Sequence, residues 1–216
     1  MMTLERDAFF SGLTERNSLD KSFAEKLRKA VVGIAGCGGL GSNVAMALTR
    51  AGVGKLIIAD FDSVVLSNLN RQFFFVDDIA KPKAEALAKN LKKINPYIEI
   101  EEKIVKVTPE NLKELFEKAD IIVEAFDNAC EKSMLINAFL EEKSFLAKYL
   151  VCASGLGGIA SSNLIKTIRY SQRVYAVGDF VSSVCNGVGV VAPRVFLAAA
   201  QEANMVVRLI AGETEP

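Results

Sequence analysis

One stretch in the first third of the chain constrains its fold more than any other part of the sequence. An apolar run, Val31-Val32-Gly33-Ile34-Ala35, leads into a glycine-rich turn, Gly36-Cys37-Gly38-Gly39-Leu40-Gly41. A helical stretch begins near Ser42 and reaches Ala51, and a second apolar run, Lys55-Leu56-Ile57-Ile58-Ala59, follows it. Strand, glycine turn, helix and strand in this order predict one unit of a parallel sheet that is flanked by helices.

The turn matches the G-x-G-x-x-G pattern of nucleotide-binding units at Gly36, Gly38 and Gly41. These glycines allow a tight turn, close approach of the backbone to a phosphate, and close packing of the helix on the strand. The helix then directs free N–H groups and the positive end of its dipole at an anion. Asp60 ends the second strand about 20 residues later, where it can accept hydrogen bonds from ribose hydroxyls. Nucleotide binding is the leading prediction, and a glycine turn without a ligand is the alternative.

Composition excludes several classes of function. The chain of 216 residues has 26 basic and 26 acidic side chains, so no positive surplus favours nucleic acid or an anionic membrane. No apolar run approaches the ~20 residues that span a bilayer. Residues 1–20 are charged and lack a signal-peptide core, which predicts a cytoplasmic location. Histidine is absent, which excludes Ser-His-Asp and Cys-His nucleophiles and any histidine base.

The four cysteines, Cys37, Cys130, Cys152 and Cys185, are widely separated and never form a C-x-x-C pair. We therefore expect neither a structural zinc site nor, in a reducing cytoplasm, disulfide bonds. Each cysteine is expected to be a small buried apolar residue.

The rest of the chain alternates helical and extended segments. Helices are expected over residues 5–13, 18–29, 82–94, 109–118, 129–143 and 193–211, and strands over residues 97–107, 120–126, 145–154, 165–169 and 174–177. The last two strands are predicted to be antiparallel additions. The fold class is therefore α/β, a Rossmann-like and mostly parallel sheet flanked by helices, with a few antiparallel strands toward the C-terminus. We expect an N-terminal helical segment, 1–30, and one compact nucleotide-binding domain, 31–216.

Four polar motifs follow the glycine turn in chain order. They are Asp60-Phe61-Asp62, Ser67-Asn68-Leu69-Asn70-Arg71-Gln72, Lys81-Pro82-Lys83 and Asp127-Asn128. Together with the doubled glycine Gly38-Gly39, this set resembles the E1-like adenylating family of MoeB, HesA and ThiF, which activates ubiquitin-like sulfur carrier proteins. The short length and the pair Arg16-Asn17 ahead of the turn are most similar to the compact ThiF branch. The likeness covers about residues 14–212.

The resemblance implies a role for each motif. The glycine turn would hold the phosphates of ATP and Asp60 its ribose, while Asn68, Arg71 and Lys83 would grip the triphosphate and Asp127 would bind Mg²⁺. The nucleotide-binding set so implied is Gly36, Gly38, Gly39, Gly41, Asp60, Asp62, Ser67, Asn68, Asn70, Arg71, Gln72, Lys83 and Asn128. The catalytic set is Arg71, Lys83, Asp127 and Arg16. Arg16 matches an arginine that reaches the neighbouring subunit's nucleotide in dimeric relatives, which implies a homodimer.

The implied reaction suits a chain without histidine. Adenylation is attack by a carboxylate on the α-phosphorus of ATP, and this nucleophile is an anion near neutral pH, so no general base is needed. The site must instead supply positive charge and hold the attacking and leaving groups in line. Arg71, Lys83, Arg16 and an Mg²⁺ ion at Asp127 would supply that charge, and a single carboxylate suffices for Mg²⁺.

Each of these residues also has a structural alternative. Arg71 could be a solvated loop charge, Lys83 an exposed helix lysine, and Asp127-Asn128 a cap for the next helix. Some members of the family carry a conjugating cysteine in a later loop, for which Cys152 and Cys185 are the candidates. A covalent intermediate between carrier and enzyme therefore stays open.

Three functions remain open. The first is an ATP-dependent adenylyltransferase that activates the C-terminal glycine of a ThiS-like sulfur carrier protein ending in Gly-Gly, for thiamine thiazole synthesis or a related pathway. The second is an NAD- or FAD-dependent oxidoreductase, which the missing histidine and the cationic loop disfavour. The third is a non-catalytic carrier-binding scaffold, which the joint presence of the arginine, lysine and aspartate disfavours.

Overall fold

The two apolar runs that flank the glycine turn form neighbouring central strands of a seven-stranded sheet. In this computed structural model, which describes residues 5–17, 21–183 and 188–216, the strand order is β3-β2-β1-β4-β5-β7-β6. The strands are β1 (Val31–Ala35), β2 (Lys55–Ala59), β3 (Glu99–Lys103), β4 (Ile121–Glu124), β5 (Tyr149–Ala153), β6 (Lys166–Arg169) and β7 (Val174–Gly178). The chain moves outward from β1 to β3 and then returns to β4, so the order reverses between β1 and β4, where parallel sheets bind ligands.

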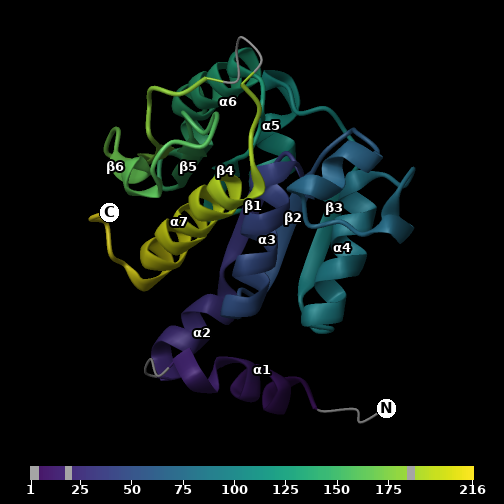
Figure 1. The fold of residues 1–216 in the computed structure, drawn as a ribbon. Coiled ribbons are helices and arrows are strands. Elements are labelled where there is room, and N and C mark those ends of the chain that lie inside the picture. Colours follow the sequence, from purple (N-terminus) through teal and green to yellow (C-terminus); the bar gives the residue numbers. More distant parts are fainter. Residues whose placement is uncertain (1–4, 18–20, 184–187) are drawn as a thin grey trace.

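Helices cover both faces of the sheet (Figure 1). They are α1 (Arg6–Thr14), α2 (Lys21–Lys29), α3 (Gly39–Ala51), α4 (Lys83–Ile94), α5 (Pro109–Phe116), α6 (Ala129–Glu141) and α7 (Ala192–Ala211). One buried apolar cluster joins α3, α4 and α7 to one face, and a second joins α5 and α6 to the other. Helix α7 lies alongside α3, and α1 and α2 lie beyond the amino ends of the strands (Figure 1).

The fold class predicted from the sequence is confirmed, with differences in detail. Strands β1, β2, β3, β4, β5 and β7 pair in parallel, and β6 runs antiparallel to β7. Antiparallel pairing at the C-terminal end is therefore limited to β6, because β7 aligns in parallel with β5. The predicted strand 145–154 begins only at Tyr149, since Phe145 lies in a short 3₁₀ turn where its ring contacts that of Phe139, 5.8 Å between centroids.

The helix after the glycine turn begins at Gly39, three residues before the predicted start at Ser42. Glycine is a poor helix former, which hid this first turn in the sequence. Packing explains it: a Cβ atom on Gly41 would lie 1.9 Å from the carbonyl oxygen of Gly36. Only glycine lets the helix approach the end of β1 this closely.

No helix within residues 5–17, 21–183 and 188–216 is long and apolar enough to cross a bilayer. The division of the chain at residue 30 stays a prediction. Ser18, the predicted first residue of the second helix, and Cys185 lie outside the described residues.

Candidate active site

The predicted nucleotide-binding residues meet at the carboxyl ends of β1, β2 and β4. The glycine turn follows β1, the polar loop follows β2, and Asp127 follows β4. The turn and the segment after β4 are in contact, because Ala125 donates its N–H to the Ala35 carbonyl at 2.9 Å. A Cβ atom on Gly36 would lie 3.0 Å from the Ala125 oxygen.

The glycine turn presents a surface suited to an anion. Gly36 has φ of +96°, a left-handed conformation that other residues rarely adopt, and its N–H donates to Ala59 at 2.8 Å. Gly38, the N-cap of α3, has no side chain to accept hydrogen bonds from the first N–H groups of the helix. A Cβ atom on Gly38 would find nothing nearer than 3.9 Å. This side of the turn is therefore open, with the helix N–H groups available to a phosphate.

Asp60 ties the glycine turn to the loop after β2. Its Oδ2 accepts the Cys37 N–H at 2.6 Å and its Oδ1 accepts the Asp62 N–H at 2.8 Å. Burial raises the pKa of this carboxyl, and the two backbone hydrogen bonds partly oppose that rise. Each oxygen keeps a further lone pair for a ribose hydroxyl. The sequence predicted only the ribose contact, and the second role of Asp60 as a brace emerges from the structure.

Lys83 is the first residue of α4 and is buried, so it is not the exposed helix lysine that was its structural alternative. Its Nζ lies 2.8 Å from Oδ2 of Asp62, a carboxylate that is half exposed. The backbone N–H of Lys83 also donates to the Asp62 carbonyl at 2.8 Å. Asp62, predicted to bind nucleotide, therefore holds the lysine in place at the strand edge.

Arg71 lies against the first turn of α3. Its Cγ and Nε lie 3.5 Å from the position of a Cβ atom on Gly39. Its Nη1 donates to Oδ1 of Asn70 at 2.9 Å and to the Ser67 carbonyl at 3.5 Å. Ser67 and Asn70 thus orient the guanidinium beside the glycine turn, which fits the anion-binding role predicted for Arg71.

Two side chains of α3 that sequence reasoning missed fasten this loop. Asn43 donates through Nδ2 to the carbonyls of Gly39 and Arg71, at 2.6 and 2.9 Å. Ser42 accepts the Phe73 N–H at 2.9 Å. Their signal in the sequence is a pair of polar residues on a helix face that is otherwise buried.

Asn68 and Gln72, the remaining residues of the loop after β2, differ in their contacts. Asn68 is buried, and its Oδ1 accepts the Val65 N–H at 3.0 Å, so it shapes the loop. Gln72 is also buried, and its Oε1 has no hydrogen-bond partner among the described residues. Its Nε2 is the atom nearest to a Cβ on Gly38. The Gln72 amide therefore lies beside the turn with Nε2 toward it, which fits the nucleotide contact that the resemblance implies.

Asp127 and Asn128 have different contacts in the structure. Asn128 caps α6, accepting the N–H groups of Cys130 and Glu131 at 2.8 and 3.3 Å. Asp127 is exposed, and within the described ranges nothing bonds to its carboxylate. The capping alternative therefore holds for Asn128 and not for Asp127. Buried Glu124 accepts the Phe126 N–H at 2.7 Å and pairs with Lys132 at 3.1 Å, which fixes the turn that carries Asp127.

A magnesium ion would find one free carboxylate at this edge. Within the described ranges, no group of three His, Cys, Asp or Glu side chains could hold a metal ion. Asp127 alone suits an ion that is held mainly by phosphate oxygens and water.

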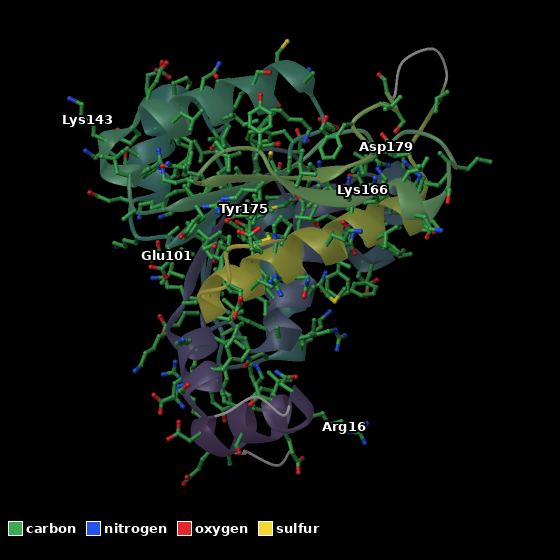
Figure 2. All side chains as sticks on the ribbon, turned by 90° about the vertical axis from the view of Figure 1, so that its left-hand side faces the viewer. Arg16, Glu101, Lys143, Lys166, Tyr175 and Asp179 are labelled. Atoms are coloured by element: carbon green, nitrogen blue, oxygen red, sulfur yellow. The ribbon has the colours of Figure 1, made fainter. Side chains whose placement is uncertain are left out.

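Arg16 lies at the other end of the molecule. Its neighbour Asn17 donates to the Ala51 carbonyl at the C-terminal end of α3, at 3.4 Å, whereas the glycine turn lies at the N-terminal end. The 13 residues of α3 separate the two ends by about 20 Å. Figure 2 shows Arg16 and Asp179, which follows β7, at opposite ends of the molecule. Arg16 does not reach the glycine turn of its own chain.

Two of the three described cysteines are buried, and Cys130 is exposed on the first turn of α6, so the expectation of burial is wrong for Cys130. Burial, then the nearby Asp60 charge, raises the pKa of Cys37 well above its ordinary value. Burial, then Glu124 and Glu202, raises the pKa of Cys152 to about 12. Neither buried thiol has the depressed pKa of a reactive cysteine.

Comparison with known proteins agrees with this geometry. A model of the ThiF family matches residues 13–216. The chain belongs to the ThiF family. The resemblance stated from the motifs is therefore confirmed.

Two sequence relatives and one solved structure show the range of this likeness. The sulfur carrier protein ThiS adenylyltransferase of Bacillus subtilis is 33% identical over 213 residues, covering 93% of this chain and 62% of that protein. Ubiquitin-like modifier-activating enzyme 5 of Drosophila ananassae is 37% identical over 142 residues, 60% of this chain and 35% of that protein. The structure of the Escherichia coli tRNA N6-threonylcarbamoyladenosine dehydratase TcdA in complex with AMP superposes with a TM-score of 0.82, covering 98% of both chains at 21% identity. The chain thus spans under two thirds of the Bacillus subtilis protein and about a third of the Drosophila enzyme. The likeness to TcdA shows a shared fold.

Proposed function

We propose that this ThiF-family chain is an ATP-dependent adenylyltransferase that activates the C-terminal carboxylate of a small ubiquitin-like carrier protein. The observation that carries the proposal is the meeting of three features at one sheet edge. These are the open N-terminus of α3, the cations Arg71 and Lys83, and the unpaired carboxylate of Asp127. Two relatives are named for activating a sulfur carrier protein and a ubiquitin-like modifier, which supports the same reaction here.

The residues of the site divide the work of the reaction. The N–H groups at the start of α3 and the guanidinium of Arg71 receive phosphate oxygens of ATP, and Asp60 receives the ribose. Lys83 exchanges its half-exposed partner Asp62 for a phosphate oxygen. A carboxylate oxygen of the carrier attacks the α-phosphorus, the bond from that phosphorus to the β-phosphate oxygen breaks, and pyrophosphate leaves. Mg²⁺ bound at Asp127 would neutralise charge on the triphosphate.

This set of side chains favours adenylation over the oxidoreductase alternative. Two cations suit a triphosphate, and a free carboxylate suits the metal ion bound to it. A dinucleotide requires neither the cations nor the metal-binding carboxylate. No thiol is needed, because the carboxylate itself forms the mixed anhydride with AMP.

The site is proposed to be completed across a homodimer. Arg16 lies beyond reach of the glycine turn in its own chain, so it can contribute charge only to a neighbouring subunit. The test is mixing. Arg16→Ala and Arg71→Ala chains are each expected to be inactive, but a mixed dimer has one site with both arginines intact. Activity that returns to about a quarter of wild type on mixing supports the dimer, and no recovery contradicts it.

The carrier is proposed to be ThiS-like and to end in Gly-Gly, with thiamine thiazole synthesis as the pathway, on the likeness to the Bacillus subtilis relative. A carrier of the ubiquitin-like modifier class is the second candidate, favoured by the likeness to the Drosophila enzyme.

The decisive experiment is exchange of labelled pyrophosphate into ATP. We expect exchange that requires both Mg²⁺ and a carrier with its terminal glycine, with the ThiS-like carrier more efficient than a ubiquitin-like modifier. The control is the same carrier shortened by that glycine. Exchange that persists with the shortened carrier would contradict the proposal.

A further inference from the structure

Arg194 is a buried arginine next to the candidate site that none of the motifs predicted. It lies in the first turn of α7, and 4% of its surface is exposed. The next residue, Val195, places its Cγ1 3.1 Å from the position of a Cβ atom on Gly39. The first turn of α7 therefore borders the glycine turn directly.

Arg194 holds two loops with separate parts of its guanidinium. Its Nη1 donates to the carbonyls of Ala160 and Ser161, at 2.6 and 3.3 Å, in the loop after β5. Its Nη2 lies 2.6 Å from Oδ2 of Asp179, in the loop after β7. The planar, branched guanidinium makes these contacts in fixed directions, which sets the distance between the loops.

Asp179 extends the same connection. Only 5% of its side chain is exposed, and its Oδ1 accepts the N–H groups of Val181 and Ser182 at 2.9 and 2.8 Å. These hydrogen bonds and the charge of Arg194 outweigh burial and lower the pKa of Asp179. The carboxylate is therefore charged near neutral pH and orders the start of the loop after β7.

The backbone of the two loops is in close contact. A Cβ atom on Gly155, whose φ is +79°, would lie 2.3 Å from Oδ1 of Asp179, and one on Gly157 would lie 2.5 Å from the Ser183 carbonyl. Phe180 holds φ of +59°, a strained conformation for a residue with a side chain. Such strain persists only where surrounding contacts impose it, and it gathers at functional sites.

Stability alone does not account for Arg194. Its Nε is buried without a hydrogen-bond partner among the described residues, which costs stability. Buried ion pairs as a class add little stability over apolar packing, and fixing geometry is the role best attested for them. The loops that it joins instead present highly exposed apolar side chains, Ile159 at 85% and Val181 at 89%.

The position of the loops points to the second substrate. They follow β5 and β7, whereas Asp60 and the cations occupy the edge beyond β1 and β2. The nucleotide thus uses one half of the carboxyl edge, and a substrate that attacks its α-phosphorus must approach over the other half.

We propose that Arg194 is a positioning residue that joins loops 155–161 and 179–183 into one wall, which orients the carrier's C-terminal residues toward the nucleotide. The inference rests on the proposed function for the identity of the carrier. Arg194 touches no reacting atom and acts through the carbonyls of Ala160 and Ser161 and through Asp179.

The test is Arg194→Lys, with Arg208→Lys at the opposite end of α7 as the matched control. Lysine keeps a positive charge beside Asp179, so the fold is not challenged by an unpaired buried carboxylate, but it cannot reach both loops with a branched group. We expect the KM for the carrier to rise about tenfold, the scale of one lost hydrogen bond to a charged group, with the Kd of ATP unchanged. Asp179→Asn, which keeps an oxygen for the two N–H groups, should change the same constant in the same direction.

Two results would overturn the inference. One is a folded Arg194→Lys chain whose carrier KM and kcat are within twofold of wild type. The other is a rise in the Kd of ATP as large as the rise in carrier KM, because the side chain would then support the whole fold.

The wall is also tested without activity. Amide hydrogen exchange over residues 155–161 and 179–183 should be faster in Arg194→Lys than in wild type. Unchanged exchange refutes the wall. If wild-type protein gives no pyrophosphate exchange with any Gly-Gly carrier, the proposed function is refuted. The amide hydrogen exchange then still decides whether Arg194 joins the two loops into one wall.

Discussion

Glu202 offers the sharpest test of the electrostatics of this chain. It lies in the middle of α7, is fully buried, and neither carboxylate oxygen has a hydrogen-bond partner among the described residues. Burial, reinforced by the nearby Glu124 and opposed by Lys132, raises its pKa well above the ordinary value of 4.5. The folded chain therefore keeps this proton at pH values where the unfolded chain has lost it. We expect Glu202→Gln to stabilise the protein at neutral pH but not in mild acid.

The size of the effect follows from linkage. Above the unfolded pKa, near 4.5, each pH unit lowers the free energy of unfolding by about 1.4 kcal/mol until the pH reaches the raised folded pKa. Glutamine ionises in neither state, so the substitution removes this loss. Each pH unit within that window therefore adds about 1.4 kcal/mol to the advantage of Glu202→Gln, or roughly 3–6 °C in Tm for a domain of this size.

The assay is urea unfolding of wild type and Glu202→Gln at about pH 5 and about pH 7, with the free energy of unfolding taken from midpoint and slope. Glu213→Gln, which changes an exposed carboxylate just after the same helix, is the control and should show no such pH-dependent difference. A difference between wild type and Glu202→Gln that is the same at both pH values would refute the reasoning, as would destabilisation at pH 7.

Three further predictions concern the proposed site. Arg71→Ala should slow adenylation by about two to three powers of ten in single-turnover assays, the scale for one preorganised charge donor, and rates within a few-fold of wild type would place Arg71 among solvated charges. Asp127→Asn should abolish Mg²⁺-dependent pyrophosphate exchange and leave Tm unchanged. Asn128→Ala should lower the free energy of unfolding by about 1 kcal/mol, because it removes the α6 cap. Equal effects of the two substitutions on Tm would contradict the separate roles of metal ligand and helix cap. Replacing the three cysteines outside the glycine turn with Ser or Ala should leave the yield of carrier adenylate unchanged by intact mass, and a reducible adduct between wild type and carrier would show a thiol step.

Local patterns were enough to predict the centre of the fold. The runs that became β1 and β2, the turn between them and the stop of α4 at Ile94 depend on neighbours in the sequence, and the structure has them as predicted. The start of α3 at Gly39 was not predicted, because contact of Gly41 with the Gly36 carbonyl overrides the low helix propensity of glycine.

The sequence indicated which side chains gather at this sheet edge, but not which of them form ion pairs or hydrogen bonds with one another. Lys83 and Asp62 are 21 residues apart, and nothing in either motif shows that they form an ion pair. Asp179 and Arg194 pair across 15 residues from two separate elements, so no spacing rule links them. Such pairs arise from tertiary contacts, which one sequence without its fold does not display.

The two hydrogen bonds of Asp60 bear on how the proposed nucleotide site is formed. One carboxylate accepts hydrogen bonds from both the turn after β1 and the loop after β2, so it fixes these two segments relative to each other. The shape proposed to receive the ribose and phosphates therefore forms during folding, and its conformational entropy is lost then rather than during binding. In the proposed reaction ATP would therefore bind a preorganised site, and its affinity would reflect direct contacts rather than the ordering of a loop.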